Sequence, residues 1–238
     1  MNELLKSYFR PIRRSLTLRP VRTKHEAELG YWSKVLQPQD GPRPPTDGSE
    51  YRDRMLRLAG QETADFVSDK IVADFGCGPL GSLCWATSAR LRIGIDVLAA
   101  EYARFDIRAH NMCYVSSTED AIPLPPDYVD VLYTMNALDH VWRLEKMCDE
   151  LIRILAPGGM LVGAFNLDEE PTNCEPQRLT EARLKDVLLN RLKTESYRVV
   201  PLGPAGALYL HLWDDAPDPG VGRRFLVVRA IKTAPSLT

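Results

Sequence analysis

The chain has 238 residues, of which 45% are hydrophobic, and its formal net charge at pH 7 is −2. This length suits one large domain with a substantial hydrophobic core. The near-neutral charge gives no general attraction to nucleic acid or to a membrane surface. The five cysteines contain no C-x-x-C pair, so they indicate neither a disulfide framework nor a zinc site. Free thiols and the lack of long apolar runs predict a cytoplasmic protein.

The N-terminal segment, residues 1–24, is strongly basic and carries a single acid, Glu3. Apolar side chains recur every four residues from Leu4 to Leu16, which predicts an amphipathic helix interrupted by Pro11. We expect this arm to be solvated or to contact another subunit. The open alternative is that it attracts an anionic partner such as RNA.

Two further helices are predicted before residue 70. Residues 25–36 have a helical pattern, whereas the proline-rich stretch 37–48 predicts a loop. Ser49 is expected to cap a helix running from Glu50 to about Ser68. Residues 1–69 are therefore expected to form a helical N-terminal extension and lid.

From residue 70 onward, short apolar runs alternate with helical patterns, which predicts a mostly parallel sheet with helices on both faces. Strands are expected near residues 71–75, 91–95, 112–115, 129–134, 160–165, 196–201 and 224–232. Helices are expected near residues 81–89, 98–105, 143–155 and 180–193. A Pro/Gly-rich turn at 216–222 favours an antiparallel hairpin at the end of the sheet. The prediction for residues 70–238 is a doubly wound, seven-stranded α/β domain.

The most specific pattern lies at the end of the first predicted strand. The apolar run 71–73 ends in Asp74, and glycines spaced G-x-G-x-x-G follow at residues 76–81. A second apolar run ends in Asp96, whose carboxylate is placed to accept hydrogen bonds from two ribose hydroxyls. Asp74 would repel the pyrophosphate of a dinucleotide and attract an ammonium group. The pattern therefore disfavours NAD as the ligand.

Residues 74–78 resemble the first motif, D/E-x-G-x-G, of class I S-adenosylmethionine (SAM)-dependent methyltransferases. Further resemblances follow in family order: 93–96 to the second motif, 117–125 to the adenine loop, 128–133 to the fourth strand, 136–141 to the segment after it, and 151–162 to the next helix, Pro-Gly-Gly turn and strand. The resemblance covers residues 71 to about 165 and implies a Rossmann-like fold with SAM as cofactor. Residues 1–50 have no counterpart in it.

The resemblance implies a cofactor site at the carboxyl ends of the strands. Asp74 is expected to face the methionine ammonium, the glycine turn to let the backbone approach the cofactor, and Asp96 to bind the ribose. Thr118 stands where the family often has an aspartate, so a neighbouring acid is expected to replace it. The predicted cofactor-binding residues are Asp74, Gly76, Cys77, Gly78, Asp96, Thr118, Glu119, Asp120, Met135 and Asn136.

His140 is the predicted catalytic residue, a general base at the mouth of the crevice after the fourth strand. The alternative is a histidine that only packs or forms hydrogen bonds. His110 and His211 are weaker candidates, and His25 is expected on the surface. Asp139 is expected either to orient His140 or, as the favoured interpretation, to cap the helix that follows.

Side chains before the sheet could also contact ligands. Tyr31, Trp32 and Tyr51 could stack on a substrate or attract the sulfonium, the alternative being ordinary packing. Arg52 or Arg54 could pair with the methionine carboxylate, the alternative being a solvated face.

The predicted function is methyl transfer from SAM to a hydroxyl or amine of a small molecule, such as a sugar or a secondary metabolite. One alternative is an RNA methyltransferase that uses the basic arm, although no N-P-P-Y or D-P-P-Y signature is present. The other is a non-catalytic module with a methyltransferase-like fold. The acceptor and the oligomeric state do not follow from the sequence, and no metal ligands are predicted.

Overall fold

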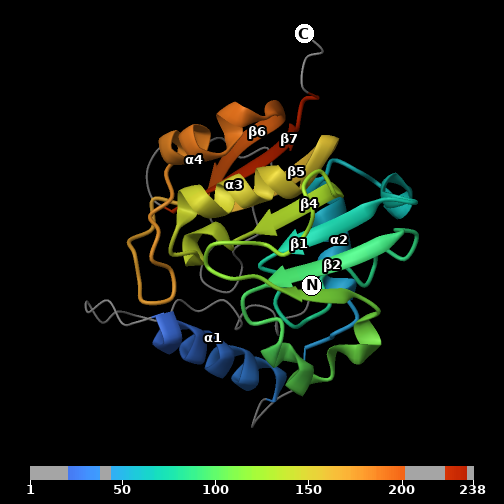
Figure 1. The fold of residues 1–238 in the computed structure, drawn as a ribbon, viewed down its shortest axis with the longest axis vertical. Coiled ribbons are helices and arrows are strands. Elements are labelled where there is room, and N and C mark those ends of the chain that lie inside the picture. The colour runs from blue at the N-terminus through green and yellow to red at the C-terminus, as the bar shows by residue number, and fades with distance from the viewer. Residues whose placement is uncertain (1–20, 38–43, 202–222, 235–238) are drawn as a thin grey trace.

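The computed structural model describes residues 21–37, 44–201 and 223–234 (Figure 1). They form one seven-stranded sheet in the order β3-β2-β1-β4-β5-β7-β6. The strands are β1 (Ile71–Phe75), β2 (Leu91–Asp96), β3 (Cys113–Ser116), β4 (Val129–Met135), β5 (Leu155–Leu167), β6 (Lys193–Pro201) and β7 (Arg224–Ile231). β1 to β5 pair in parallel, and β7 lies antiparallel between β5 and β6. The predicted doubly wound sheet with its terminal antiparallel hairpin is confirmed.

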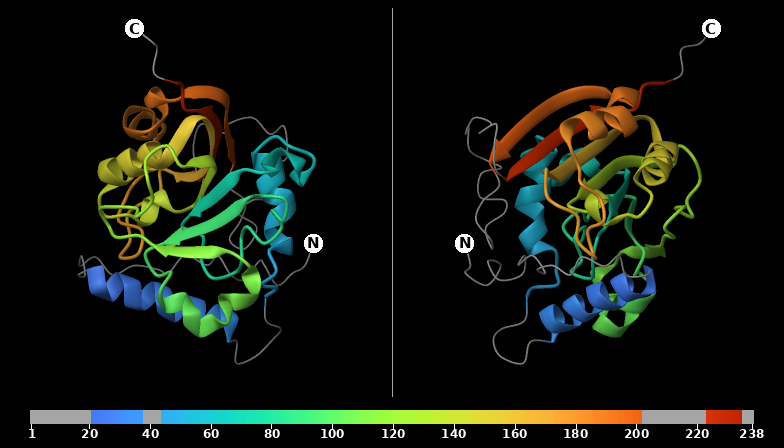
Figure 2. Two further views of the ribbon diagram at one scale, coloured as in Figure 1. Left: turned by 45° about the vertical axis from the view of Figure 1, so that its right-hand side comes forward. Right: turned by 90° about the vertical axis from the view of Figure 1, so that its left-hand side faces the viewer.

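The α-helices are α1 (Val21–Leu36), α2 (Ser49–Leu58), α3 (Leu144–Ile154) and α4 (Glu181–Val187). Short 3₁₀ turns connect them to the sheet: η2 (Ala64–Val67), η3 (Glu101–Phe105), η4 (Ile107–His110), η5 (Leu138–His140) and η6 (Leu189–Arg191). Figure 2 shows α2 and α3 on opposite sides of the sheet. None of the described helices combines the length and apolar character that a bilayer crossing requires.

The sheet is buried on both faces, which is why its strands read as apolar runs. In β1, Ile71, Ala73 and Phe75 face the cluster that contains the apolar side of α3. Val72, between them, faces the opposite cluster, to which α2 contributes Met55. This alternation follows from the two-residue period of a strand and fixes which side of β1 meets each helix.

The predicted helix at residues 81–89 is wrong, because this segment forms a series of turns. Its apolar side chains, Leu83 and Trp85, share a buried cluster with Met55 of α2. Trp85 Nε1 approaches Met55 Sδ at 3.3 Å. α2 therefore covers part of the face of the sheet that a helix after β1 was expected to cover.

The prediction for the second N-terminal helix is partly wrong. α2 ends at Leu58 rather than near residue 68, and the chain then forms the 3₁₀ turn η2. Ser49 does not cap it: the N-cap is Gly48, with φ of 74°. The Ser49 hydroxyl instead donates to Asp47 Oδ1 at 2.5 Å. The left-handed conformation of Gly48 explains why a glycine precedes this helix.

The helices predicted at 98–105 and 180–193 form only in part. Residues 101–110 make two 3₁₀ turns, and α4 ends at Val187 before a further 3₁₀ turn. The helix predicted over 25–36 is confirmed by α1, which begins at Val21. Most of the predicted amphipathic basic helix, residues 1–20, lies outside the described residues.

A third apolar cluster joins α1 to the segment after β2. Leu36, 1% exposed, packs with Leu80, Leu98, Tyr102 and Phe105. Figure 1 shows α1 beyond the edge of the sheet, rather than on one of its faces. α1 is thereby placed beside both the glycine turn and the end of β2.

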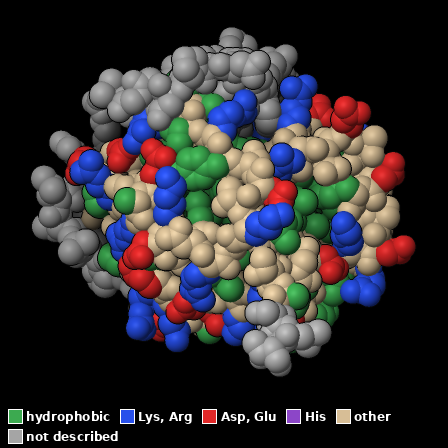
Figure 3. Space-filling model, turned by 90° about the horizontal axis from the view of Figure 1, so that it is seen from above, with side chains coloured by type: hydrophobic (Ala, Val, Ile, Leu, Met, Phe, Trp, Pro, Cys, Tyr) green, Lys and Arg blue, Asp and Glu red, His purple; other side chains and the backbone are tan. Residues whose placement is uncertain are grey.

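The surface seen from above carries a mixture of charges. Figure 3 shows Lys and Arg side chains interspersed with Asp and Glu on this face. Mixed charges of this kind favour solubility and give no single-sign field on the visible part of the face.

Arg153, in the last turn of α3, holds the loop that leads into β4. Its guanidinium donates to the carbonyl oxygens of Ile122 and Leu124, both at 2.8 Å. It also donates to Glu150, whose carboxylate accepts the Ile122 N–H at 2.8 Å. One residue of the helix thus fixes the backbone in the second half of the predicted adenine loop, residues 117–125.

Arg153→Met should lower the free energy of unfolding by about 1–3 kcal/mol, because two carbonyl oxygens lose a charged donor. Urea unfolding followed by circular dichroism measures this change. Lys146→Met, at an exposed position of the same helix, is the control and should be close to neutral. Equal stability of the two variants would contradict a structural role for the Arg153 contacts.

Candidate functional site

A cavity of about 260 Å³ lies where the carboxyl ends of β1, β2 and β4 meet α1. One side of α1 forms a wall, with Lys24, Glu28, Tyr31, Trp32 and Val35 among the lining residues. Lys24, Glu28, Tyr31 and Val35 follow one another at intervals of four, three and four residues, and Trp32 comes four residues after Glu28, so they share one broad helix face. The cavity lies where a parallel sheet reverses its strand order, which is the usual ligand position in such folds.

The Asp96 carboxylate joins the loops after β1 and β2. Oδ2 accepts the Gly78 N–H at 3.1 Å, and Oδ1 accepts the Leu98 N–H at 2.9 Å. Burial raises the pKa of Asp96, while these two backbone hydrogen bonds and one from Tyr102 lower it. These three hydrogen bonds use three of the roughly four acceptor positions of the carboxylate, and the remaining position is available to a ligand hydroxyl.

The glycine turn is as tight as its sequence predicted. Gly76 has φ of 77°, and a Cβ there would lie 2.3 Å from Ala137 Cβ. Gly78 has φ of 58°, and its Cβ would lie 2.8 Å from the Trp32 ring. Both positions therefore exclude larger residues, and Trp32 packs directly on the turn.

Asp74 is 3% exposed and borders the cavity. Burial raises the pKa of its carboxyl to about 7, and the nearby Asp96 adds to this, whereas the Ser82 hydrogen bond lowers it. The Ser82 hydroxyl donates to Asp74 Oδ2 at 2.5 Å. A cation beside Asp74 would oppose the effect of burial and favour the charged form of this carboxyl.

The segment after β3 has the form of a compact loop. Thr118 Oγ1 accepts the N–H groups of Asp120 and Ala121. Glu119 points to α1, where His25 Nε2 lies 2.9 Å from its Oε1. Asp120 instead pairs with Arg143 at 2.7 Å on the surface. Thr118 and Glu119 line the cavity, whereas Asp120 is absent from its described lining.

His140 lies at the other end of the cavity, in a strongly acidic environment. Its Nδ1 is 2.9 Å from Glu28 Oε1, and its Nε2 is 3.9 Å from Glu175 Oε1. Burial by itself lowers the pKa of His140, but Asp139, Glu28 and Glu175 raise it to about 9. Without a further cation, the imidazole is therefore protonated at neutral pH and has no free lone pair to accept a proton.

Asp139 does not cap α3, contrary to the favoured interpretation of the sequence. The N-cap of α3 is Arg143, and Asp139 lies within η5. Asp139 is 5% exposed, and its Oδ1 has no hydrogen-bond partner among the described residues. Its carboxyl is held beside His140 instead.

The structure brings most of the predicted site residues to one cavity. The predicted residues in its lining are Asp74, Gly76, Cys77, Asp96, Thr118, Glu119, Met135, Asn136 and His140. Gly78 and Asp120 are outside that lining, although Gly78 contributes its N–H to Asp96. Arg54 lines the cavity with Tyr31, Trp32 and Tyr51, whereas Arg52 does not.

The other histidines have different places. His110 is 3% exposed, with its Nδ1 2.7 Å from the Tyr114 hydroxyl, and does not line the cavity. His211 lies outside the described residues. His25 keeps 25% of its side chain exposed, and its Nε2 contacts Glu119.

Sequence reasoning missed several lining residues that come from other parts of the chain. Lys24 and Glu28 belong to α1. Asn166 lies near the end of β5, and Cys174 and Glu175 lie between β5 and α4. No local motif marks them, because their position depends on how the N-terminal helix and the 168–180 segment fold over the strand ends. The four-residue spacing of Lys24 and Glu28 is the single sequence signal that could have drawn attention to them.

Comparisons with known proteins agree with this geometry. Residues 73–163 match the methyltransferase domain family. A probable SAM-dependent methyltransferase of Mycolicibacterium smegmatis is 27% identical over 157 residues, which are 63% of this chain and 54% of that protein. The chain therefore spans about half the length of this curated relative.

Solved structures extend the likeness of fold. One match is a chain in the complex between the Haloferax volcanii Trm112 methyltransferase activator and the putative methyltransferase. Its TM-score is 0.61 at 15% sequence identity, and the match covers 92% of this chain and 100% of the other chain. A putative SAM-dependent methyltransferase of Listeria monocytogenes gives 0.55 at 18% identity, covering 79% and 100%.

The strand order and the cavity at the strand ends define a Rossmann-like methyltransferase fold of class I. Residues 73–163 match the methyltransferase domain family, and the relatives from Mycolicibacterium smegmatis and Listeria monocytogenes are named as SAM-dependent methyltransferases. The cofactor of this family is S-adenosyl-L-methionine.

The residues at the strand ends fit that cofactor. Asp74 is a buried carboxyl and Asp96 a partly buried one, and neither forms an ion pair among the described residues, which suits a ligand carrying an ammonium and a sulfonium. Asn136 and Asn166 line the same cavity, and the Oδ1 atom of each is buried without a hydrogen-bond partner in the described ranges. Buried polar atoms of this kind favour a polar ligand in the cavity.

Asp74→Asn should remove the part of the pH dependence of the free energy of unfolding that comes from the Asp74 carboxyl. The folded pKa of about 7 lies above an unfolded pKa of roughly 3.9, so the contribution of Asp74 to stability is fully present below pH ~4 and is lost as the pH rises through 7. Between pH 5 and pH 8, wild type should lose about 2–3 kcal/mol relative to the Asn variant.

Urea unfolding of both proteins at the two pH values measures this difference. Asp53→Asn, at a side chain that is 84% exposed, is the control and should follow wild type. Parallel pH profiles for Asp74→Asn and wild type would show that the folded protein does not hold this proton.

Proposed function

We propose that the protein transfers a methyl group from SAM to a hydroxyl or amine of a small molecule, such as a sugar or a secondary metabolite. The observation that carries this proposal is one continuous cavity that joins the Asp74–Asp96 end to the His140 end. A cavity of about 260 Å³ roofed by α1 favours a compact acceptor over a polymer. The free thiols of all five cysteines suit a reducing cytoplasm, which we propose as its location.

In this proposal, one end of the cavity binds the cofactor and the other end binds the acceptor. Asp96 binds the ribose hydroxyls, Asp74 faces the methionine ammonium, and Met135 and Asn136 flank the methionyl group. When bound, SAM supplies the electrophilic methyl group, so the protein has to align the acceptor and exclude water. In this proposal the acceptor lies between Asn166 of β5 and His140 of η5, which both line the cavity.

The N-terminal extension, residues 1–69, acts as a lid in this proposal. α1 contributes Tyr31 and Trp32 to the cavity, and Trp32 covers the Gly78 backbone. α2 differs from α1 because it packs on the sheet through Met55 and Leu56. Within the extension, α1 is therefore the part suited to open and close.

Asp96→Ala should weaken SAM binding by about 2–4 kcal/mol, because the ribose loses its hydrogen bonding to a charged group and water recovers only part of that loss. Titration calorimetry with SAM and S-adenosylhomocysteine measures it, with wild type expected to bind both and not NAD. The Asp53→Ala variant, altered at an exposed position, should retain wild-type affinity. Tight binding of NAD without binding of SAM would overturn the proposed function.

Trp32→Ala should weaken SAM binding about tenfold, a loss of ~1.4 kcal/mol, because the lid loses the packing of its indole ring on the Gly78 backbone. Lys34→Ala, exposed on the same helix, should leave the affinity unchanged. Calorimetry distinguishes the two variants, and thermal unfolding checks that both remain folded. Wild-type affinity in the Trp32 variant would argue against the lid.

Methyl transfer itself is tested by the release of S-adenosylhomocysteine in the presence of candidate acceptors. Sugars, phenols and amines form one panel, and short RNAs form a second. Transfer to RNA alone would favour the basic-arm alternative. SAM binding without turnover on either panel would favour the non-catalytic module.

A further inference from the structure

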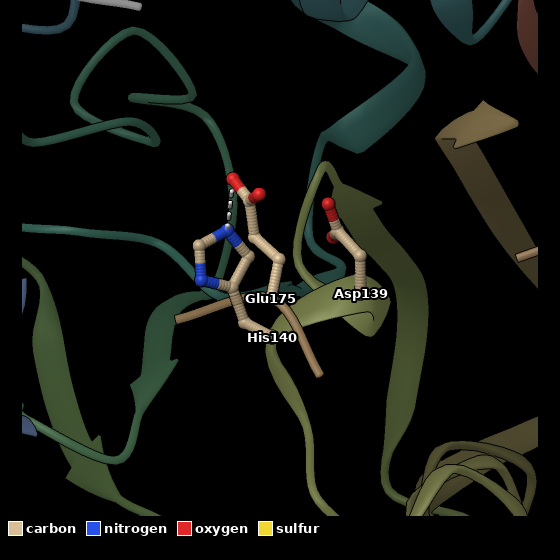
Figure 4. Close-up of side chains that lie close together, drawn as sticks. All are labelled: Asp139, His140 and Glu175. Carbon is tan, nitrogen blue, oxygen red and sulfur yellow. Dashed lines mark ion pairs between the residues drawn. The ribbon is translucent and has the colours of Figure 1, made fainter. Parts of the chain in front are cut away.

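Three side chains with metal-binding atoms meet at the acceptor end of the cavity. Asp139 and His140 come from η5, directly after β4, and Glu175 comes from the segment between β5 and α4. One ligand atom from each residue lies within 4.8 Å of the other two. Figure 4 shows the three side chains side by side, with the His140–Glu175 ion pair drawn between them.

Asp139 makes this cluster different from a solvated acidic patch. The residue is 5% exposed, and its Oδ1 is buried with no hydrogen-bond partner among the described residues. A buried carboxylate oxygen without a donor is costly unless a cation meets it. His140 Nε2 and Glu175 Oε1 are 3.9 Å apart, which is too long for a direct hydrogen bond. The two atoms therefore leave room for an ion between them and Asp139.

The surrounding contacts hold the three groups in place. Glu28 Oε1 lies 2.9 Å from His140 Nδ1, so the other ring nitrogen, Nε2, faces the cluster. The Thr172 hydroxyl donates to Glu175 Oε2 at 3.3 Å, and the Gln177 N–H donates to the Asp139 carbonyl at 3.1 Å. A carboxylate behind a histidine and a hydroxyl behind a carboxylate are common supports of metal ligands.

We propose that His140, Asp139 and Glu175 bind a divalent first-row transition-metal ion such as Mn²⁺ or Zn²⁺. One imidazole nitrogen and two carboxylate oxygens suit such ions. Three protein ligands leave at least one coordination position open, as in catalytic metal sites. Since His140 and Glu175 line the cavity, the open position lies beside the proposed acceptor.

The role of the ion rests on the proposed function, whereas its binding does not. A divalent ion at this place would coordinate an acceptor hydroxyl and lower its pKa, so that its proton passes to solvent at a lower pH than in the free acceptor. The acceptor atom would then be an oxygen rather than an amine nitrogen. His140 would act as a metal ligand and not as the general base predicted from the sequence.

Binding is tested on the full chain after treatment with a chelator and dialysis. Mn²⁺ and Zn²⁺ are titrated separately by calorimetry, and Mn²⁺ binding is checked by electron paramagnetic resonance. Wild type should bind one ion, and Asp139→Asn and Glu175→Gln should each weaken binding at least about tenfold. Glu170→Gln is the matched control, because Glu170 lies in the same segment, is 63% exposed and pairs with Arg178.

The proposal is overturned if wild type shows no saturable binding of either ion below roughly 1 mM, or if both variants bind like wild type. Should Asp139→Asn fail to fold, the partly exposed Glu175 still allows the test. SAM titrations on the same samples keep the two proposals separate. Normal SAM binding with no metal binding refutes only the metal site, and metal binding without SAM binding refutes only the proposed function.

Discussion

The structure of the site depends on the Asp96 carboxylate. Its two oxygens accept the N–H groups of Gly78 and Leu98 and so connect the turns that follow β1 and β2. Because β1 and β2 are adjacent parallel strands, both turns emerge at the same edge of the sheet. The shared carboxylate fixes their separation, and α1 then packs on the resulting surface through Trp32. Loss of this carboxylate would affect the cofactor end and the lid together.

Concentration of negative charge at the strand ends is the second feature of the site. Asp74, which is buried, and Asp96, which is partly buried, lie at one end, and Asp139, Glu28 and Glu175 surround His140 at the other. Buried carboxyls destabilise an empty protein as they ionise, so cationic ligands are favoured at both ends. The same charge that opposes folding at neutral pH is thus available to bind an ammonium, a sulfonium or a metal ion.

The strands and the cofactor end were predictable because they rest on local signals. An apolar run followed by Asp74 and a glycine turn identifies a strand and its ligand-facing end in a parallel sheet. The helix expected at 81–89 was not predictable in this way, because α2 already packs against that face. The Ser82 hydroxyl bonds to Asp74, and the Cys84 carbonyl accepts from Arg92, so long-range contacts replaced the helical pattern.

The sequence by itself determined the class of fold, the places of the strands along the chain and the acids at the ends of β1 and β2, because these follow from periodicity and chain connectivity. The tertiary structure alone decided the ionisation and the partners of His140. Its neighbours Glu28 and Glu175 lie 112 and 35 positions away in the chain, and their approach is set by how α1 and the 168–180 segment pack. Electrostatic energies depend on distance and burial in space, which local sequence patterns do not encode.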